Sequence, residues 1–316
     1  MPGNSWEIRI YMPSYRKEWD DFVLVSRNGT FLFMRGYMDY HADRFHDCSL
    51  MAYYSGKLFA LLPAHLVGNI LLSHKGLTYG GMIINDKMTA SQMLSLFGTI
   101  INYLKNRGVV KWIYAPIPYI YSKYPSEEDL YALFRFNARL TERKISTVIP
   151  LSYLKPFSTL RRRKVNHAIR EGLIICQTDD FTSFWSVLKD NLKERHQAEP
   201  VHSLNEILLL KQRFPLHICL YCVYDKGNNV IAGTVLYLTD KVVHVQYIGS
   251  TQKGRNVGAV DLLFYHLIHE VYNDKVYFDM GTSVEDGGHF LNEGLIFQKE
   301  GFGGRAVVYD TYEIDL

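Results

Sequence analysis

The sequence predicts an α/β protein of two tandem lobes, each a mixed, mostly antiparallel sheet flanked by helices. The first observation is length, since 316 residues exceed the size at which one hydrophobic core usually keeps growing. The second is an internal repeat: the order strand, strand, helix, strand occurs once in each half of the chain, and such repetition indicates a repeated structural unit. We therefore expect an N-terminal lobe over residues 1–155 and a C-terminal lobe over residues 156–316.

The composition is that of an ordinary globular protein. Hydrophobic residues make up 47% of the chain and charged residues 21%, which argues against a disordered chain. The net charge of +3 is too small to indicate a nucleic-acid-binding protein. No leader is visible at the start, no segment reaches the ~18 apolar residues of a membrane span, and the 4 cysteines are scattered. We expect a cytoplasmic, reduced protein without a membrane span.

The first copy of the repeat begins after the Ser55-Gly56 turn. An apolar strand is predicted over 57–64, and a second apolar run then leads to 77–81. Apolar residues at three- and four-residue steps between 93 and 104 predict a helix, which Gly108 ends. The β-branched and aromatic run 110–115 predicts the closing strand.

The second copy repeats this order. Strands are predicted over 230–237 and 242–249, followed by a helix with apolar residues between 262 and 271 and by a strand over 275–280. Between the copies, two amphipathic helices are predicted over 159–170 and 182–194.

The segment 250–259 follows a predicted strand and precedes a helix. Backbone N–H groups at a helix N-terminus, together with glycines, can hold an anion such as a phosphate, and basic side chains add to this. An ordinary glycine-rich turn is the alternative. The candidate cofactor-binding residues are Gly249, Ser250, Lys253, Gly254, Arg255, Gly258 and Ala259.

The run 281–304 gathers charged residues behind the last strand of the second copy. Glu285 is the candidate catalytic base, because it follows a strand end among small residues and a carboxylate in a partly dry cleft can take the proton of an amine. Lys299 is a candidate substrate-binding residue. Most of the other charges in this run suit a solvated loop.

Further candidates lie near the helix 182–194 and on the strand 242–249. His202 can assist proton transfer at neutral pH, and His196 is a candidate acceptor contact; a structural or solvent-facing role is the alternative for both. Gln246 and Tyr247 are candidate substrate contacts, but neighbours on a strand point to opposite faces, so only one can face a cleft.

No metal site is expected. Cys219 and Cys222 have the spacing of a zinc or redox pair, but they lie on a predicted strand. Residues three apart on a strand point to opposite faces and cannot share a metal ion.

Two segments carry a resemblance to a known family. Residues 297–302, Phe-Gln-Lys-Glu-Gly-Phe, resemble the closing motif of the GNAT acyltransferases, and 252–259 resembles their acyl-CoA pyrophosphate loop. With the duplicated lobe and the basic helix 160–172, the chain resembles the FemAB-like branch of tandem GNAT proteins. Phe297 stands where many of these enzymes have a tyrosine that protonates the leaving thiolate.

The resemblance implies an N-acyltransferase. It implies an acyl-CoA donor, such as acetyl-CoA, in the C-terminal lobe and an amine acceptor on an amino sugar or on a cell-envelope or polysaccharide precursor. One alternative is a FemABX-type transferase that uses aminoacyl-tRNA, which a basic face over 161–170 would favour. Another is a non-catalytic module that binds a nucleotide-sugar, which Phe297 favours.

Overall fold

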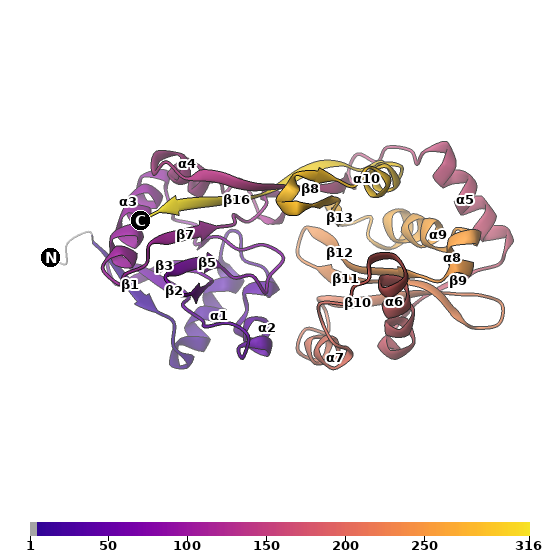
Figure 1. Ribbon diagram of the computed structural model, residues 1–316, viewed down its shortest axis with the longest axis horizontal. Coiled ribbons are helices and arrows are strands. Elements are labelled where there is room, and N and C mark those ends of the chain that lie inside the picture. The colour runs from indigo at the N-terminus through magenta and orange to yellow at the C-terminus, as the bar shows by residue number, and fades with distance from the viewer. Residues whose placement is uncertain (1–4) are drawn as a thin grey trace. The chain divides into compact units, whose positions relative to one another are not determined.

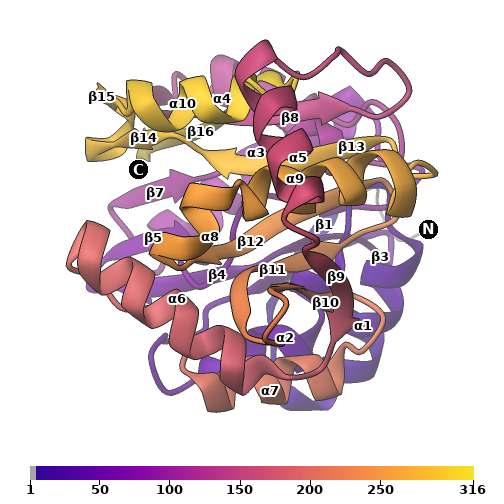
Figure 2. The same cartoon turned by 90° about the vertical axis from the view of Figure 1, so that its right-hand side faces the viewer.

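The computed structural model describes residues 5–316, apart from the side chains of Arg195 and His196. Figures 1 and 2 show its helices and strands from two sides. The predicted α/β class is confirmed, since helices pack on mixed sheets in both halves of the chain.

The chain packs into two compact units. Unit 1 holds the residues up to Lys144 together with Glu285–Phe290 and Val308–Leu316, and unit 2 holds Ile145–Val284 and Leu291–Val307. This division by packing differs from the predicted boundary between 155 and 156, because the C-terminal segment leads the chain back into unit 1.

Unit 1 contains a four-stranded antiparallel sheet and part of a second sheet. The first has the order β1 (Trp6–Ile10), β2 (Leu50–Tyr54), β3 (Lys57–Leu62), β6 (Ile83–Ile84). In the second, β4 (Ala64–Val67), β5 (Ile70–Ser73), β7 (Lys111–Tyr114) and the end of β16 (Arg305–Asp315) are neighbours. The helices are α1 (Arg16–Val25), α2 (Arg35–Met38), α3 (Ala90–Lys105) and α4 (Glu128–Arg135).

Helix α3 is the predicted helix of the first copy. A capping box between Thr89 and Gln92 fixes its start, because each side chain bonds the backbone N–H of the other residue. Its apolar stripe is buried in the core with Trp112 of β7.

Unit 2 is built on one mixed sheet. Its order is β8 (Arg139–Pro150), β13 (Tyr277–Thr282), β12 (Val242–Ser250), β11 (Val230–Leu238), β10 (Ile218–Tyr224), β9 (Ile174–Thr178). Its helices are α5 (Thr159–Arg170), α6 (Phe181–His196), α7 (Leu204–Arg213), α8 (Gln252–Val257), α9 (Ala259–His266) and α10 (Glu293–Glu300). The short strands β14 (Val284–Glu285) and β15 (Phe290–Leu291) pair with each other.

The helices of unit 2 cover both faces of its sheet. Helices α5 and α9 lie side by side (Figure 2) and bury their apolar residues against one face. Helix α6 packs on the other face, where a side chain at Gly233 or Gly249 would collide with Phe184 or Leu188. The predicted helices over 159–170 and 182–194 are thus α5 and α6.

Strands β12 and β13 run parallel for only a few residues. They pair from Val242 to His244 on β12 and then separate. Just beyond, β12 carries a bulge against β11, because Val235 pairs with Tyr247 and Leu236 with Val245, leaving Gln246 as the extra residue. The separation opens space between these strands and the helices above them.

Candidate active site in unit 2

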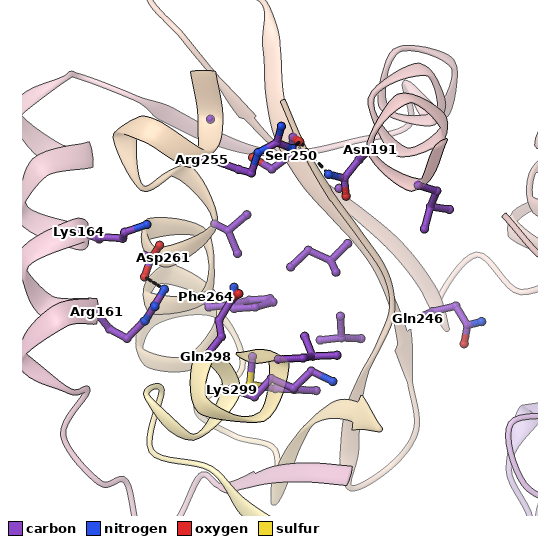
Figure 3. Close-up of a pocket in the computed structure, with 18 residues that line it drawn as sticks. Arg161, Lys164, Asn191, Gln246, Ser250, Arg255, Asp261, Phe264, Gln298 and Lys299 are labelled. Atoms are coloured by element: carbon purple, nitrogen blue, oxygen red, sulfur yellow. Dashed lines mark hydrogen bonds and ion pairs between the residues drawn. The ribbon is translucent and has the colours of Figure 1, made fainter. Parts of the chain in front are cut away.

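A cavity of about 450 Å³ lies in unit 2 and is lined by β12 and by the helices α5, α6, α8, α9 and α10 (Figure 3). Its floor is apolar, with Ile248 and Phe264 among the lining residues. Its polar lining comes from Arg161, Lys164, Asn191, Gln246, Ser250, Arg255, Asp261, Gln298 and Lys299.

The polar lining of this cavity carries more positive than negative charge. Arg161 and Lys164 come from α5, and Arg255 and Lys299 from α8 and α10. Asp261 of α9 is the one acidic residue among the described lining residues. A cleft lined mostly by one sign of charge attracts ligands of the opposite sign, so this cavity suits an anionic ligand.

Arg161 and Asp261 form a buried ion pair. Arg161 Nη1 donates a hydrogen bond to Asp261 Oδ1 at 2.8 Å. Burial raises the pKa of Asp261 above its ordinary value, although the guanidinium beside it acts in the opposite direction. The pair ties α5 to the first turn of α9, where a carboxylate also complements the helix dipole.

Lys299 lies at the side of the cavity nearest β13. Only 9% of it is exposed, and Nζ donates hydrogen bonds of 2.8 Å to the carbonyl oxygens of Gly281 and Thr282. Burial lowers the pKa of Lys299 to about 8, while the charge of Asp279 acts to raise it. The predicted substrate-binding lysine thus lines the cavity.

The predicted glycine loop forms the short helix α8 and the start of α9. Gly249, Ser250, Gly254 and Arg255 line the cavity, and their role in binding a cofactor stays a prediction. Arg255 also donates a hydrogen bond of 2.7 Å to the Ser250 carbonyl oxygen.

The other three predicted residues of this loop do not line the cavity. Lys253 extends toward solvent and forms an ion pair of 2.5 Å with Asp225. Gly258 adopts φ +79° and packs so closely on Lys164 that an added Cβ would lie 2.7 Å from its carbonyl oxygen. Ala259 is fully buried in the core. Gly258 and Ala259 therefore serve turn formation and packing, whereas Lys253 forms a surface ion pair.

The predicted anion cradle is partly occupied by the protein itself. In α8, the Gly254 N–H donates a hydrogen bond to the side chain of Thr251, whereas the Arg255 N–H makes the first hydrogen bond of the helix, to the Thr251 carbonyl oxygen. In α9, Asp261 lies in the first turn. The side chains of Lys164 and Arg255 line the cavity and can pair with a phosphate.

Gln246 and Tyr247 lie at the bulge of β12, where the simple alternation of strand faces does not apply. Gln246 lines the cavity, whereas Tyr247 packs against Trp185 of α6. The Oη of Tyr247 lies 2.5 Å from Nδ1 of His202 and accepts a hydrogen bond from its backbone N–H at 3.1 Å. Burial raises the pKa of Tyr247 to about 12. His202 therefore anchors its loop to β12 and does not line the cavity; the side chain of His196 lies outside the described part of the chain.

Glu285 and Phe297 also lie outside the lining of the cavity. Glu285 is exposed at the end of β14 and is grouped with unit 1, whereas the cavity lies in unit 2, so its role as a base stays a prediction. Phe297 is 66% exposed on α10, whereas Leu295, Gln298 and Lys299 of that helix line the cavity. A tyrosine at position 297 would therefore not face this cavity.

Sequence reasoning missed several residues of the cavity. One of them is Arg161, which shares the buried face of α5 with Val165 and Ala168. That spacing of four and seven residues was visible in the sequence. The other polar lining residues that were missed are Lys164, Asn191, Asp261 and Gln298.

Unit 1 has a cavity of its own, of about 630 Å³. Its acidic residues have basic neighbours: Asp310 bonds Arg143, Glu313 bonds Lys111, and Glu142 bonds Lys144. This cavity is therefore nearly balanced in charge, unlike the one in unit 2.

Two general features complete the description. Across residues 5–316, no group of three or more His, Cys, Asp or Glu side chains is arranged to hold a metal ion. In the same part of the chain, no helix combines the length and the apolar character that a membrane crossing requires.

Comparison with known proteins relates this fold to acyltransferases. A family model described as an acetyltransferase (GNAT) domain matches residues 158–288, which run from the start of α5 past β14. No curated protein matches the chain.

Three solved structures share the fold along nearly the whole chain. FemX is 12% identical, with 98% of this chain and 97% of that chain covered and a TM-score of 0.68. The C-terminal domain of a protein described as a lysylphosphatidylglycerol synthetase of Agrobacterium fabrum is 12% identical, with coverage of 96% and 92% and a TM-score of 0.62. A tandem GNAT protein from the clavulanic acid biosynthesis pathway is 9% identical, with coverage of 98% of both chains and a TM-score of 0.56.

These likenesses confirm the predicted tandem architecture of two GNAT-like lobes. The GNAT domain match falls on the unit that holds the positively charged cavity. The chain therefore has the fold of tandem GNAT proteins such as FemX, and its residues 158–288 match the GNAT acetyltransferase domain.

Proposed function

We propose that this protein is an N-acyltransferase that joins an activated acyl group to an amine in the cavity of unit 2. The observation that carries the proposal is the position of Lys299, a nearly buried lysine on the wall of a positively charged cavity. A cation with little access to water can stabilise negative charge that develops in a transition state. The acceptor we propose is an amine on an amino sugar or on a cell-envelope or polysaccharide precursor.

In the proposed reaction, the amine nitrogen attacks the acyl carbonyl carbon. The bond from that carbon to the sulfur or oxygen of the donor then breaks, and the leaving group keeps the electron pair. The proton lost by the amine passes to the leaving group or to water, so atoms and charge balance. Lys299, as an ammonium group, donates a hydrogen bond to the carbonyl oxygen while negative charge builds up there.

The first candidate donor is an acyl-CoA. The match of residues 158–288 to an acetyltransferase domain supports it. Lys164 and Arg255 supply cationic side chains for its phosphates. In this arrangement the acyl group reaches Lys299 across the apolar floor formed by residues such as Ile248 and Phe264.

A second candidate donor is aminoacyl-tRNA. One observation favours it: the N-terminal turn of α9 already holds Asp261, where a CoA pyrophosphate was expected. The outward face of α5 also carries the exposed Arg162, Arg163 and Arg170, which suit a longer polyanion.

The donor is tested by thermal unfolding of the purified protein with acetyl-CoA, longer acyl-CoAs, free CoA and bulk tRNA. A ligand at about a hundred times its dissociation constant stabilises by roughly 2.7 kcal/mol, which moves the midpoint by a few degrees. Donors that bind are then incubated with amino sugars, and the amide product is identified by mass spectrometry. If the protein binds a donor but forms no amide with the amines tested, the result contradicts an acyltransferase and favours a non-catalytic binding module.

Two neighbouring variants on α5 separate the donors. Lys164 lines the cavity, whereas Arg163 is exposed on the same helix. With acyl-CoA as the donor, Lys164→Ala weakens binding and Arg163→Ala does not. With tRNA as the donor, both variants weaken binding, and the affinity falls steeply with salt.

A further inference from the structure

Strand β13 ends in a bulge against β8. Asp279 pairs with Val148 and Thr282 with Ser146, so three steps along β13 correspond to two along β8. Gly281 lies within the bulge at φ +76°, a conformation that favours glycine.

The bulge supplies the two hydrogen-bond acceptors that hold the ammonium group of Lys299. The carbonyl oxygens of Gly281 and Thr282 both lie 2.8 Å from its Nζ. Because these two acceptors come from adjacent peptide groups, their convergence on one nitrogen depends on the conformation of the bulge.

Asp279 holds this bulge from inside the fold. Its side chain is fully buried, and Oδ1 accepts hydrogen bonds from the Gly281 N–H at 3.0 Å and from Ser146 Oγ at 2.5 Å. Oδ2 lies 2.8 Å from Nδ1 of His244. One carboxylate thus connects β8, β12 and the bulge of β13, at the point where β12 and β13 separate.

Asp279 is also the carboxylate whose charge acts on Lys299. Burial lowers the pKa of Lys299, and Asp279 acts against that change. The other charged groups that line the cavity come from α5, α8 and α9: Arg161, Lys164, Arg255 and Asp261. Asp261 is engaged by Arg161.

We propose that Asp279 is a positioning residue for Lys299: it fixes the two carbonyl groups that seat the ammonium group and supplies the negative charge that balances it. The inference rests on the proposed function only in giving Lys299 a part in acyl transfer. The seating itself is a property of the protein without substrate.

An Asp279→Asn variant removes the charge and keeps the shape. The asparagine oxygen can still accept from Gly281 and Ser146, and its amide can donate to His244 in the tautomer with an unprotonated Nδ1. The bulge therefore keeps its hydrogen bonds, and the change at Lys299 reports the lost charge.

The test is a titration of Lys299 in protein labelled with ¹³C-lysine, read by NMR without substrate. A Lys299→Gln variant assigns the signal by its disappearance. In the native protein we expect a midpoint near pH 8. In Asp279→Asn we expect a midpoint about one pH unit lower, the low end of the effect of a nearby opposite charge.

Two control variants show whether the shift of the Lys299 midpoint is specific to the charge of Asp279. Ser146→Ala removes a hydrogen bond and keeps the charge of Asp279, and Asp261→Asn removes the other carboxylate of the cavity; neither should lower the midpoint by a comparable amount. An unchanged midpoint in Asp279→Asn, or an equal fall in Ser146→Ala, overturns the proposal.

A third variant covers the case in which Asp279→Asn does not fold. Gly281→Ala strains the bulge and leaves Asp279 in place, so it is expected to displace the carbonyl groups and lower the midpoint of Lys299. If Gly281→Ala folds and Lys299 keeps its native midpoint, the bulge does not hold Lys299 as proposed.

The outcomes also separate this inference from the proposed function. Since the titration needs no substrate, a native midpoint in Asp279→Asn overturns the positioning role and leaves acyl transfer untouched. If the Lys299 midpoint falls in Asp279→Asn as expected, but the native protein forms no amide, acyl transfer is contradicted and the positioning role stands.

Discussion

Lys299 is the residue on which the proposed chemistry depends most. Replacing it with glutamine removes the cation and is expected to lower kcat by about 10²–10³, the loss seen when one donor to a developing oxyanion is deleted. Steady-state kinetics of amide formation measure the effect. Lys253→Gln is the matched control, because Lys253 pairs with Asp225 and does not line the cavity. Equal losses in both variants would remove Lys299 from its role.

The same residue makes activity depend on pH. Burial lowers the pKa of Lys299 to about 8, so the ammonium form dominates at pH 7 and disappears as the pH rises through about 8. With Lys299 acting as a cation, kcat should fall on the alkaline side with a midpoint near 8. A kcat that keeps rising through that midpoint would contradict a cationic role of Lys299.

Among the residues of the cavity, the sequence predicted several that lie in recognisable motifs. It missed those that reach the cavity only through the packing of helices. Gly249, Ser250, Gly254, Arg255, Gln246 and Lys299 were predicted and line the cavity. Asp261 was missed because its importance depends on Arg161, which is one hundred positions away in the chain. Such a pair exists only once α5 packs on α9.

Among the elements, the junction of α8 and α9 leaves no room for a side chain at Gly258. Gly258 combines φ +79° with a close approach to the backbone of Lys164. Gly258→Ala is therefore expected to destabilise unit 2 by more than the roughly 1 kcal/mol of a left-handed alanine. Gly172→Ala is the control, since Gly172 has φ +69° and only the flexible end of Lys226 nearby. Urea unfolding compares the two, and equal losses would contradict the packing argument.

Helices and strands were predicted well where a periodic pattern is local. The ranges 159–170 and 230–237 match α5 and β11 closely. The bulges in β12 and β13 could not be predicted, because a bulge is defined by the register with a neighbouring strand. Both bulges shape the site, so the geometry of the site could not be predicted from the sequence.

The whole molecule follows the predicted tandem plan, but part of the C-terminal region belongs to unit 1, which no local sequence pattern indicates. The repeat predicted two lobes in order along the chain, yet β14, β15 and β16 lead the C-terminal region back to unit 1. Strand pairing between β16 and β7 joins residues about two hundred positions apart. Long-range pairing of this kind leaves no periodic signal in either strand.

The stability of the molecule should depend on pH through a cluster of histidines in unit 1. The ring of His74 lies 5.2 Å from that of His41 and 5.4 Å from that of His65, and all three are nearly buried. Burial, followed by the neighbouring histidines, lowers the pKa of His74 to about 3, and burial lowers that of His65 as well.

Because the folded pKa of His74 is below its unfolded value of about 6.5, the unfolded chain binds the proton more readily. Stability is therefore full above about pH 6.5 and falls as the pH drops toward 3, by up to about 1.4 kcal/mol per pH unit for this group. His74→Asn keeps an acceptor for the Gly76 N–H and cannot titrate. Hydrogen exchange of unit 1 peptides between pH 7.5 and 4.5 should show a flatter loss of protection in His74→Asn than in the native chain. Replacing the exposed His289 by asparagine should leave the native slope. If His289→Asn flattens the slope as much as His74→Asn, the acid sensitivity of unit 1 does not come from the buried cluster.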